Sequence, residues 1–205
     1  MNFVNVREQV TDRLRVEILL GHYEPGEALR EIPLAERYKV SRGPIRDAFL
    51  QLSQQGLLDL IPNRGVRIGK VWDESMLPVM AKLRFDLESF AIRELMDRPP
   101  EDLKDKLNHN LRLFKLACED KDMLEIVQLD LAFHRMFLRD CGHDGLESVW
   151  LALLGGFRLP YSRHRMLTES SDEHRYVADA IMTGRKKDAI EGLKRNILNP
   201  FTKRK

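Results

Sequence analysis

The sequence has few cysteines, no long apolar run and little excess of either charge. Its 205 residues include only two cysteines, Cys118 and Cys141, with no CxxC spacing. Two cysteines cannot form a disulfide framework, so we expect reduced thiols in a cytoplasmic protein. No apolar run reaches the roughly 18 residues of a membrane span, and residues 1–10 lack the features of a signal peptide. These absences predict no membrane partner.

The formal net charge of +2 conceals two local basic segments. Residues 37–46 and residues 60–72 each contain several arginines or lysines and no acidic residue. Local basic segments on a nearly neutral chain favour contact with a polyanion over a generally adhesive surface. By charge alone, an ordinary solvated surface remains an alternative interpretation.

The first 70 residues alternate between helical and extended patterns. Residues 6–20 have the apolar spacing of an amphipathic helix, and residues 32–38 and 42–54 predict two further helices around a tight turn. Residues 57–61 and 66–71 then predict a hairpin, with turn-forming residues between them. The order of helix, helix-turn-helix and hairpin predicts a winged helix-turn-helix.

After Trp72 only helical periodicity follows, up to Leu198. Interruptions are expected at residues 97–100, 119–121, 141–145, 168–172 and 183–185. The pattern predicts about six helices and no strand. We therefore expect a mainly α chain with two domains, a winged helix-turn-helix over residues 1–72 and an all-α helical bundle over residues 73–205.

Polar and basic side chains gather at the start of the second helix of the predicted helix-turn-helix. Ser41 is placed to begin this helix, and Arg42 and Arg46 are four residues apart, so they project from one face. Arginines at this position can contact guanine edges or phosphates, and the helix N-terminus favours a phosphate. Arg64 and Gly65 lie at the tip of the hairpin, where glycine allows close approach to DNA.

The same residues carry a resemblance to a known family. Leu34-Ala35-Glu36, Val40-Ser41-Arg42, Pro44-Ile45-Arg46, Gly56-Leu57 and Pro62-Asn63-Arg64-Gly65 resemble the signature of GntR-family transcriptional regulators. The resemblance implies that the DNA contacts are Ser41, Arg42, Arg46, Arg64 and Gly65. It also implies a homodimer on double-stranded DNA with a palindromic operator. Gly43 stands where the family has threonine, which could remove one hydroxyl contact.

The helical part resembles the FCD class, named after the FadR C-terminal domain. The resemblance rests on Arg84 to Ala91 (RxxxExxA), Asp130 to His134 (DxxFH), and Glu173-His174 followed by Asp179-Ala180-Ile181. It implies a domain that binds a small effector and mediates dimerisation.

Three residues of these motifs have the chemistry of a metal site. Asp130 and His134 are four residues apart on one predicted helix, and His174 would join them from another helix. Carboxylate and imidazole ligands suit zinc, nickel or manganese. Asn196 stands where the family commonly has a further histidine, and a neutral amide is a poor zinc ligand. A weaker site, a harder metal or an empty site all remain open, as does a buried structural role for His134.

Arg84 is the candidate for binding a carboxylate effector, because a guanidinium group matches a carboxylate. An intrahelical pair with Glu88 is the alternative, since the spacing suits it equally. Arg158 and Tyr161 are further candidates for the same pocket, and the sequence does not decide their role.

These observations predict a ligand-responsive transcriptional regulator whose effector is a small organic acid bound near a divalent metal. One alternative is a regulator whose helical domain lacks metal and serves only for dimerisation. Another is a metal-dependent enzyme, but no general base stands beside the candidate ligands, so we expect no catalytic residues.

Overall fold

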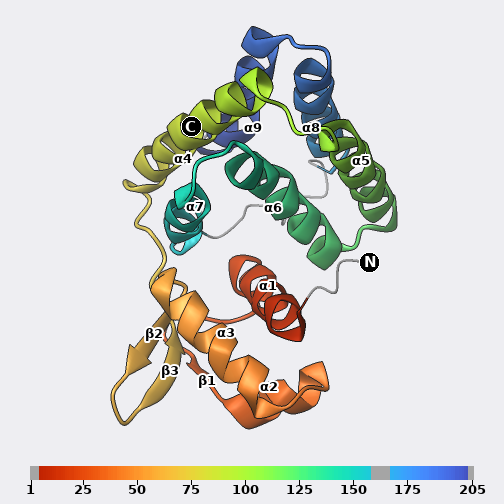
Figure 1. Cartoon of the computed structure of the whole chain (residues 1–205). Helices are drawn as coiled ribbons and strands as arrows, with labels where there is room; N and C mark the ends of the chain where they lie inside the picture. Colours follow the sequence, from red (N-terminus) through yellow and green to blue (C-terminus); the bar gives the residue numbers. More distant parts are fainter. Residues whose placement is uncertain (1–4, 158–166, 203–205) are drawn as a thin grey trace. The chain divides into compact units, whose positions relative to one another are not determined.

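The computed structural model describes residues 5–157 and 167–202 (Figure 1). The chain divides into two compact units. The first contains Met1–Trp72 and also Leu151–Leu159, and the second contains Asp73–Trp150 and Pro160–Lys205. None of the described helices is long and apolar enough to cross a membrane.

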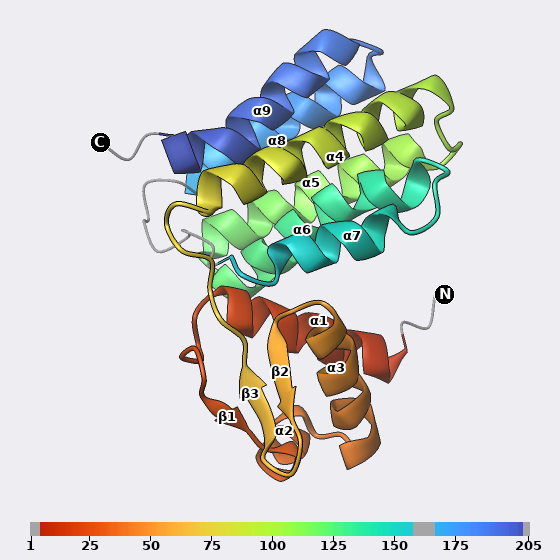
Figure 2. The same cartoon turned by 90° about the vertical axis from the view of Figure 1, so that its left-hand side faces the viewer.

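The first unit is a winged helix-turn-helix. Its elements are α1 (Val6–Leu19), β1 (Ala28–Leu29), α2 (Glu31–Tyr38), α3 (Arg42–Gln54), β2 (Leu58–Ile61) and β3 (Gly65–Ile68). The three predicted helices and the hairpin of β2 and β3 are confirmed. Strand β1 was not predicted. It pairs antiparallel with β3, which lies between β1 and β2 in the sheet (Figure 2).

The core of this unit lies between α1 and α3. Leu14 and Ile18 from α1 and Ile45 and Leu52 from α3 are completely buried, and their burial stabilises the packing of α3 on α1. The turn between α2 and α3 is closed by a left-handed residue, Lys39, with φ of 55°. Ser41 is the N-cap residue of α3, as predicted, but its side chain makes no capping hydrogen bond.

Six helices follow, as the periodicity predicted, and no strand occurs in the described residues after Trp72. They are α4 (Leu77–Asp97), α5 (Leu103–Asp120), α6 (Met123–Asp140), α7 (Leu146–Leu154), α8 (Leu167–Met182) and α9 (Lys186–Thr202). Helix α9 packs on α4 and α8, while α6 packs on α4 and α5. Large aromatic side chains fill the interior, with Phe114, Phe133, Phe137 and Trp150 almost completely buried.

The interruption expected at residues 168–172 was wrong, because α8 already begins at Leu167. The polar composition of this segment resembles a loop, but hydroxyl and acidic side chains also suit the first turns of a helix. Glu169 lies in the first turn, and the carbonyl of Ser170 faces the side chain of His174 one turn later. The other four interruptions coincide with helix ends.

Candidate functional site

The exposed start of α3 carries two of the predicted DNA-contacting arginines. The side chains of Arg42 and Arg46 are 54% and 59% exposed, and both contact Glu31, the first residue of α2. The Arg42 Nη2–Glu31 Oε2 distance is 2.7 Å, and the Arg46 Nε–Glu31 Oε2 distance is 2.9 Å. Hydrogen bonds from Arg42 and then from Arg46 keep the pKa of Glu31 below its usual value. Sequence reasoning missed Glu31.

Arg64 and Gly65 are exposed at the turn between β2 and β3. Gly65 has φ of 80° and Asn63 has φ of 60°, so two residues of this tight turn are left-handed. Glycine adopts this conformation without steric cost. Ser41, Arg42, Arg46, Arg64 and Gly65 therefore all lie on exposed parts of the winged helix-turn-helix.

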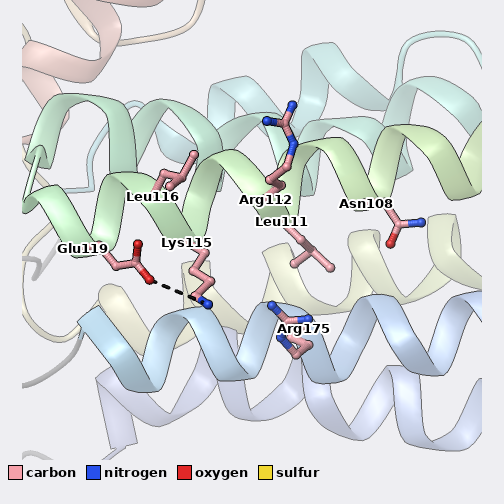
Figure 3. A pocket seen from close by; sticks show the side chains of 7 residues that line it. All are labelled: Asn108, Leu111, Arg112, Lys115, Leu116, Glu119 and Arg175. Atoms are coloured by element: carbon pink, nitrogen blue, oxygen red, sulfur yellow. Dashed lines mark ion pairs between the residues drawn. The ribbon is translucent and has the colours of Figure 1, made fainter.

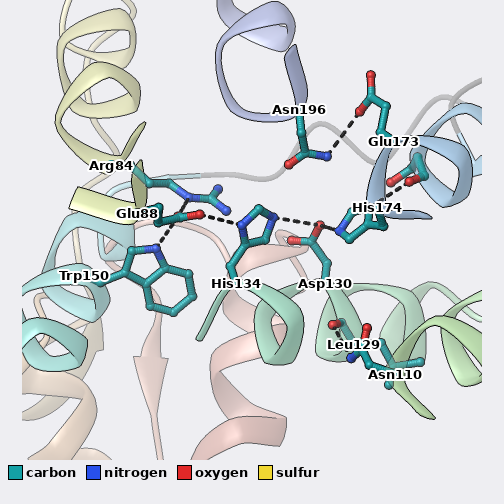
Figure 4. Close-up of polar contacts among 11 residues, drawn as sticks. Arg84, Glu88, Asn110, Leu129, Asp130, His134, Trp150, Glu173, His174 and Asn196 are labelled. Carbon is teal, nitrogen blue, oxygen red and sulfur yellow. Dashed lines mark hydrogen bonds and ion pairs between the residues drawn. The ribbon is translucent and has the colours of Figure 1, made fainter. Parts of the chain in front are cut away.

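The second candidate site is a buried cluster in the helical unit (Figure 4). Asp130 and His134 extend from α6 and His174 extends from α8, and each is less than 5% exposed. Asp130 Oδ1 is 3.0 Å from His174 Nε2 and 3.8 Å from His134 Nε2, and all the potential ligand atoms lie within 4.8 Å of one another. The structure thus brings the three predicted metal ligands together.

The hydrogen-bond partners of the two histidines determine which ring nitrogen faces the cluster. His134 Nδ1 lies 2.6 Å from Glu88 Oε2, and His174 Nδ1 lies 2.7 Å from the carbonyl oxygen of Ser170. An ionised carboxylate and a carbonyl only accept hydrogen bonds, so both Nδ1 atoms carry the proton. In the neutral rings, both Nε2 atoms then present lone pairs.

Neither Nε2 atom has an aligned hydrogen-bond donor among the described residues, although both are buried. The short distance between His174 Nε2 and Asp130 Oδ1 joins two acceptors in this tautomer. Buried polar atoms are rarely left unpaired in native proteins. The two imidazole Nε2 atoms with available lone pairs and the carboxylate oxygen of Asp130 therefore form a ligand set that suits a divalent cation.

Sequence reasoning named Glu88 only as a possible partner of Arg84 and missed its contact with His134 of this cluster. Glu88 is completely buried and accepts hydrogen bonds from Arg84 Nε, at 2.6 Å, from Trp150 Nε1 and from His134 Nδ1. Burial raises the pKa of Glu88, but the charge of Arg84 and the hydrogen bonds from His134 and Arg84 outweigh it and lower the pKa to about 2. Glu88 is thus an anion that fixes the orientation of His134.

Asp130 is also held as an anion. Burial raises the pKa of Asp130, while a hydrogen bond from His174 and the charge of His134, when these rings are protonated and hold no metal, together with the charge of Arg84, lower it well below the usual range. The ring of Phe114 stacks on His174, with ring centroids 4.4 Å apart. Helices α5, α6 and α8 therefore all contribute to the position of the two ligands Asp130 and His174.

Asn196 and Arg84 lie beside this cluster in Figure 4. Asn196 Nδ2 donates a hydrogen bond to Glu173 Oε2 at 3.2 Å, so its amide nitrogen is turned toward α8. Arg84 makes the intrahelical pair with Glu88 that sequence reasoning kept as an alternative. Its effector-binding role stays a prediction. Arg158 and Tyr161 lie outside the described residues.

An open groove of about 330 Å³ lies between α5 and α8 (Figure 3). Three cationic side chains line it, Arg112, Lys115 and Arg175, and Lys115 lies 3.7 Å from Glu119. These four charged side chains are all exposed. The groove therefore lacks the buried and oriented polar groups that distinguish the cluster around Asp130.

Comparison with known families identifies the class of protein. A model of the GntR family of bacterial regulatory proteins matches residues 6–68, and a model of the FCD domain matches residues 79–199. The chain belongs to the GntR family and carries an FCD domain. The GntR family comprises bacterial regulatory proteins, and relatives of this chain are transcriptional repressors and not enzymes.

Individual relatives agree with this assignment. The chain is 27% identical to the gluconate operon transcriptional repressor of Bacillus subtilis over 92% of this chain and 80% of the relative. It is 31% identical to the transcriptional repressor RspR of Escherichia coli over 66% of this chain, and this match spans 60% of the length of RspR. Among solved structures, McbR/YncC of E. coli has the same fold, with a TM-score of 0.75 and 20% identity over 97% of this chain and 96% of McbR/YncC.

Proposed function

We propose that this chain is a ligand-responsive transcriptional regulator that binds DNA as a homodimer in the bacterial cytoplasm. Residues 1–72 form the DNA-binding domain in this proposal, and residues 73–205 form the domain that binds the effector and mediates dimerisation. The observation that carries the proposal is the buried cluster of Asp130, His134 and His174. A purely architectural bundle has no need for three buried polar ligands whose lone pairs converge.

The proposed DNA contacts are Ser41, Arg42 and Arg46 at the start of α3, and Arg64 and Gly65 in the wing. The N-terminus of α3 has no side-chain cap and carries two exposed guanidinium groups, which suits the major groove. The turn of the wing is exposed and tight, which suits a contact with the DNA backbone or minor groove. A two-fold symmetric dimer would place two such surfaces on a palindromic operator.

The cluster in the helical unit fits a divalent metal ion, because its two Nε2 lone pairs lack donors and Asp130 supplies an anionic oxygen. The spacings of 3.0 and 3.8 Å around Asp130 match the roughly 3–4 Å expected between atoms that are each about 2.1 Å from one ion. Zinc, nickel and manganese are the candidates. When bound, such an ion supplies a Lewis acid with positions open to an effector.

The effector that we propose is a small organic acid. A carboxylate can complete the coordination of a divalent ion, and Arg84 places a second positive charge near the cluster, since it contacts Glu88, which contacts His134. Asn196 offers only a neutral amide oxygen, so the ligand set contains more oxygen than a set with a third histidine. This difference favours a harder ion such as manganese over zinc.

In this proposal the protein has one state that binds DNA and one that does not. The effector regulates DNA binding because it binds these two states with different affinity. The competing proposal is that the helical unit serves only for dimerisation. The two proposals differ in a measurable way, because only the first requires a metal and a ligand-dependent change in DNA affinity.

Metal content per chain is the test. Full-length untagged protein is purified without chelator, dialysed against zinc, nickel or manganese, and measured by elemental analysis. We expect about one ion per chain, as for a single three-residue site, and its loss in His134→Ala. His109→Ala is the matched control, because His109 is an exposed histidine outside the cluster. Wild-type protein that binds none of the three metals would refute the metal site and favour the dimerisation proposal.

A further inference from the structure

Glu31 joins the two arginines that are proposed to contact DNA. Its carboxylate accepts from Arg42 Nε and Nη2 at 3.0 and 2.7 Å, and from Arg46 Nε at 3.0 and 2.9 Å. The carboxylate stands in the first turn of α2, where the helix dipole favours an anion. One residue of α2 therefore sets the direction of two side chains of α3.

The atoms used in these contacts are informative. A guanidinium group has five N–H bonds, on Nε and on two terminal nitrogens. Glu31 takes Nε of both arginines and one N–H of Arg42 Nη2. The described contacts leave Nη1 of Arg42 and both terminal nitrogens of Arg46 available. These are the atoms farthest from α3, and a bidentate contact with guanine needs two such N–H groups.

The contacts contribute little to the stability of the fold. The arginine side chains are more than half exposed, and ion pairs at such positions are weakened by solvent and salt. Their effect on DNA binding is larger for two reasons. Long side chains lose rotamer freedom on binding, and a side chain that is already oriented loses less. The negative charge of Glu31 also disfavours a close approach of phosphate oxygens to the same arginines.

We infer that Glu31 is a positioning residue that directs Arg42 and Arg46 toward base edges and away from phosphates. Glu31 thereby raises the sequence specificity of the regulator and lowers its general affinity for DNA. This inference rests on the proposed role of Arg42 and Arg46 in DNA contact. A simple competitor, which occupies the arginines until DNA displaces it, would instead weaken binding to every sequence alike.

The test compares two DNA duplexes. One is the sequence that the wild-type chain selects from a randomised pool, and the other is a scrambled duplex of equal length and composition. In Glu31→Gln, we expect tighter binding to the scrambled duplex and no gain for the selected one, so that the ratio of the two Kd values falls about tenfold. Glu31→Asp keeps the charge but shortens the reach, so its ratio should fall without tighter binding to the scrambled duplex.

Glu36→Gln is the matched control, because Glu36 is exposed on the same helix and its replacement removes the same charge. It should leave the ratio of Kd values unchanged. Circular dichroism and thermal unfolding should show Glu31→Gln to be folded, with a Tm within a few degrees of the wild type, as expected for an exposed pair. A Glu31→Gln variant that keeps the wild-type ratio, or that binds both duplexes more tightly by the same factor, overturns the inference.

A double-mutant cycle separates this inference from the proposed function. If Glu31 acts through Arg46, Glu31→Gln should have a smaller effect on the ratio in an Arg46→Ala background than in the wild type. If Glu31→Gln changes the ratio equally in the wild type, in the Arg46→Ala background and in the Arg42→Ala background, the inference about Glu31 is overturned. The proposed DNA contacts would then still stand. If Arg42→Ala and Arg46→Ala themselves keep the wild-type ratio, the proposed DNA contacts fail first.

Discussion

Replacement of Glu88 by glutamine should reverse the tautomer of His134. The carboxylate of Glu88 accepts hydrogen bonds from Arg84, Trp150 and His134. Glutamine has one acceptor oxygen and one amide nitrogen. If the oxygen continues to face Arg84 and Trp150, the amide donates to His134 Nδ1. The imidazole proton then moves to Nε2, and the lone pair that faces Asp130 is lost.

The size of the effect follows from the burial of the site. Glu88 is completely buried and the side chain of Arg84 is only 10% exposed. Removing one partner of a buried ion pair costs about 3–5 kcal/mol, and we expect the lower end because the amide oxygen still accepts. Loss of the partner that orients a metal-bound histidine typically weakens metal binding by about 10–100-fold. Both losses should be measurable in a protein that still folds.

Three assays examine this prediction. Urea unfolding followed by circular dichroism gives the free energy of unfolding, and titration with zinc, nickel or manganese gives the metal affinity. Nitrogen-15 NMR of the imidazole ring distinguishes a proton on Nδ1 from one on Nε2 in the metal-free protein. The matched control is Glu94→Gln, because Glu94 is also on α4 and also contacts a histidine, His143, at 3.3 Å.

The Glu94–His143 contact is solvent-exposed, with 37% of the Glu94 side chain and 49% of the His143 side chain accessible. Loss of such a surface pair should change the free energy of unfolding by about 0–1 kcal/mol, with no change in metal affinity. Retention of the His134 proton on Nδ1 in Glu88→Gln would refute the predicted change of tautomer. The reasoning would also be refuted if Glu88→Gln and Glu94→Gln had the same metal affinity and stability.

Three further predictions concern other parts of the chain. Arg46→Ala should weaken binding to the selected duplex by about 1–3 kcal/mol, measured by fluorescence anisotropy, and an unchanged Kd would exclude Arg46 from base contact. Asn196→His should tighten zinc binding, because imidazole replaces a neutral amide; equal or weaker affinity in calorimetric titration would place residue 196 outside the ligand set. Glu17 is buried, and hydrogen bonds from Tyr38 and Arg13 together with the charge of Arg37 overcome the effect of burial and lower its pKa. A lowered pKa stabilises the fold above pH 4.5, and this stabilisation is lost as the pH falls through the folded-state value. Glu17→Gln should therefore have a smaller loss of Tm below pH 4.5 than the wild type, and identical pH profiles would contradict this.

The helices and the wing of this protein could be predicted because their signals are local. Apolar residues at helical spacing gave the three helices of the first unit, and α3 has the predicted bounds Arg42–Gln54. The i, i+4 spacing placed Asp130 and His134 on one face of α6 for the same reason. The resemblance of Glu173-His174 to an FCD motif, and not spacing, joined His174 to this pair.

Other features depended on residues distant in the sequence. Strand β1 has only two residues, too few for an alternating pattern, and it exists because Ala28 and Leu29 pair with β3 nearly 40 residues later. Helix α8 began earlier than predicted because its polar first turns resemble a loop in composition.

The contacts of Glu31 with Arg46 and of Glu88 with His134 were decided by the tertiary structure alone. Each of the two glutamates lies on a helix, and a charged residue of this kind is most often a solvated surface group. The packing of α4 on α6 brings Glu88 to His134, 46 residues away. The turn between α2 and α3 brings Glu31 to Arg46, 15 residues away. The sequence determined which chemical groups the chain carries, whereas the packing of its helices determined which proton, charge or ion each group can hold.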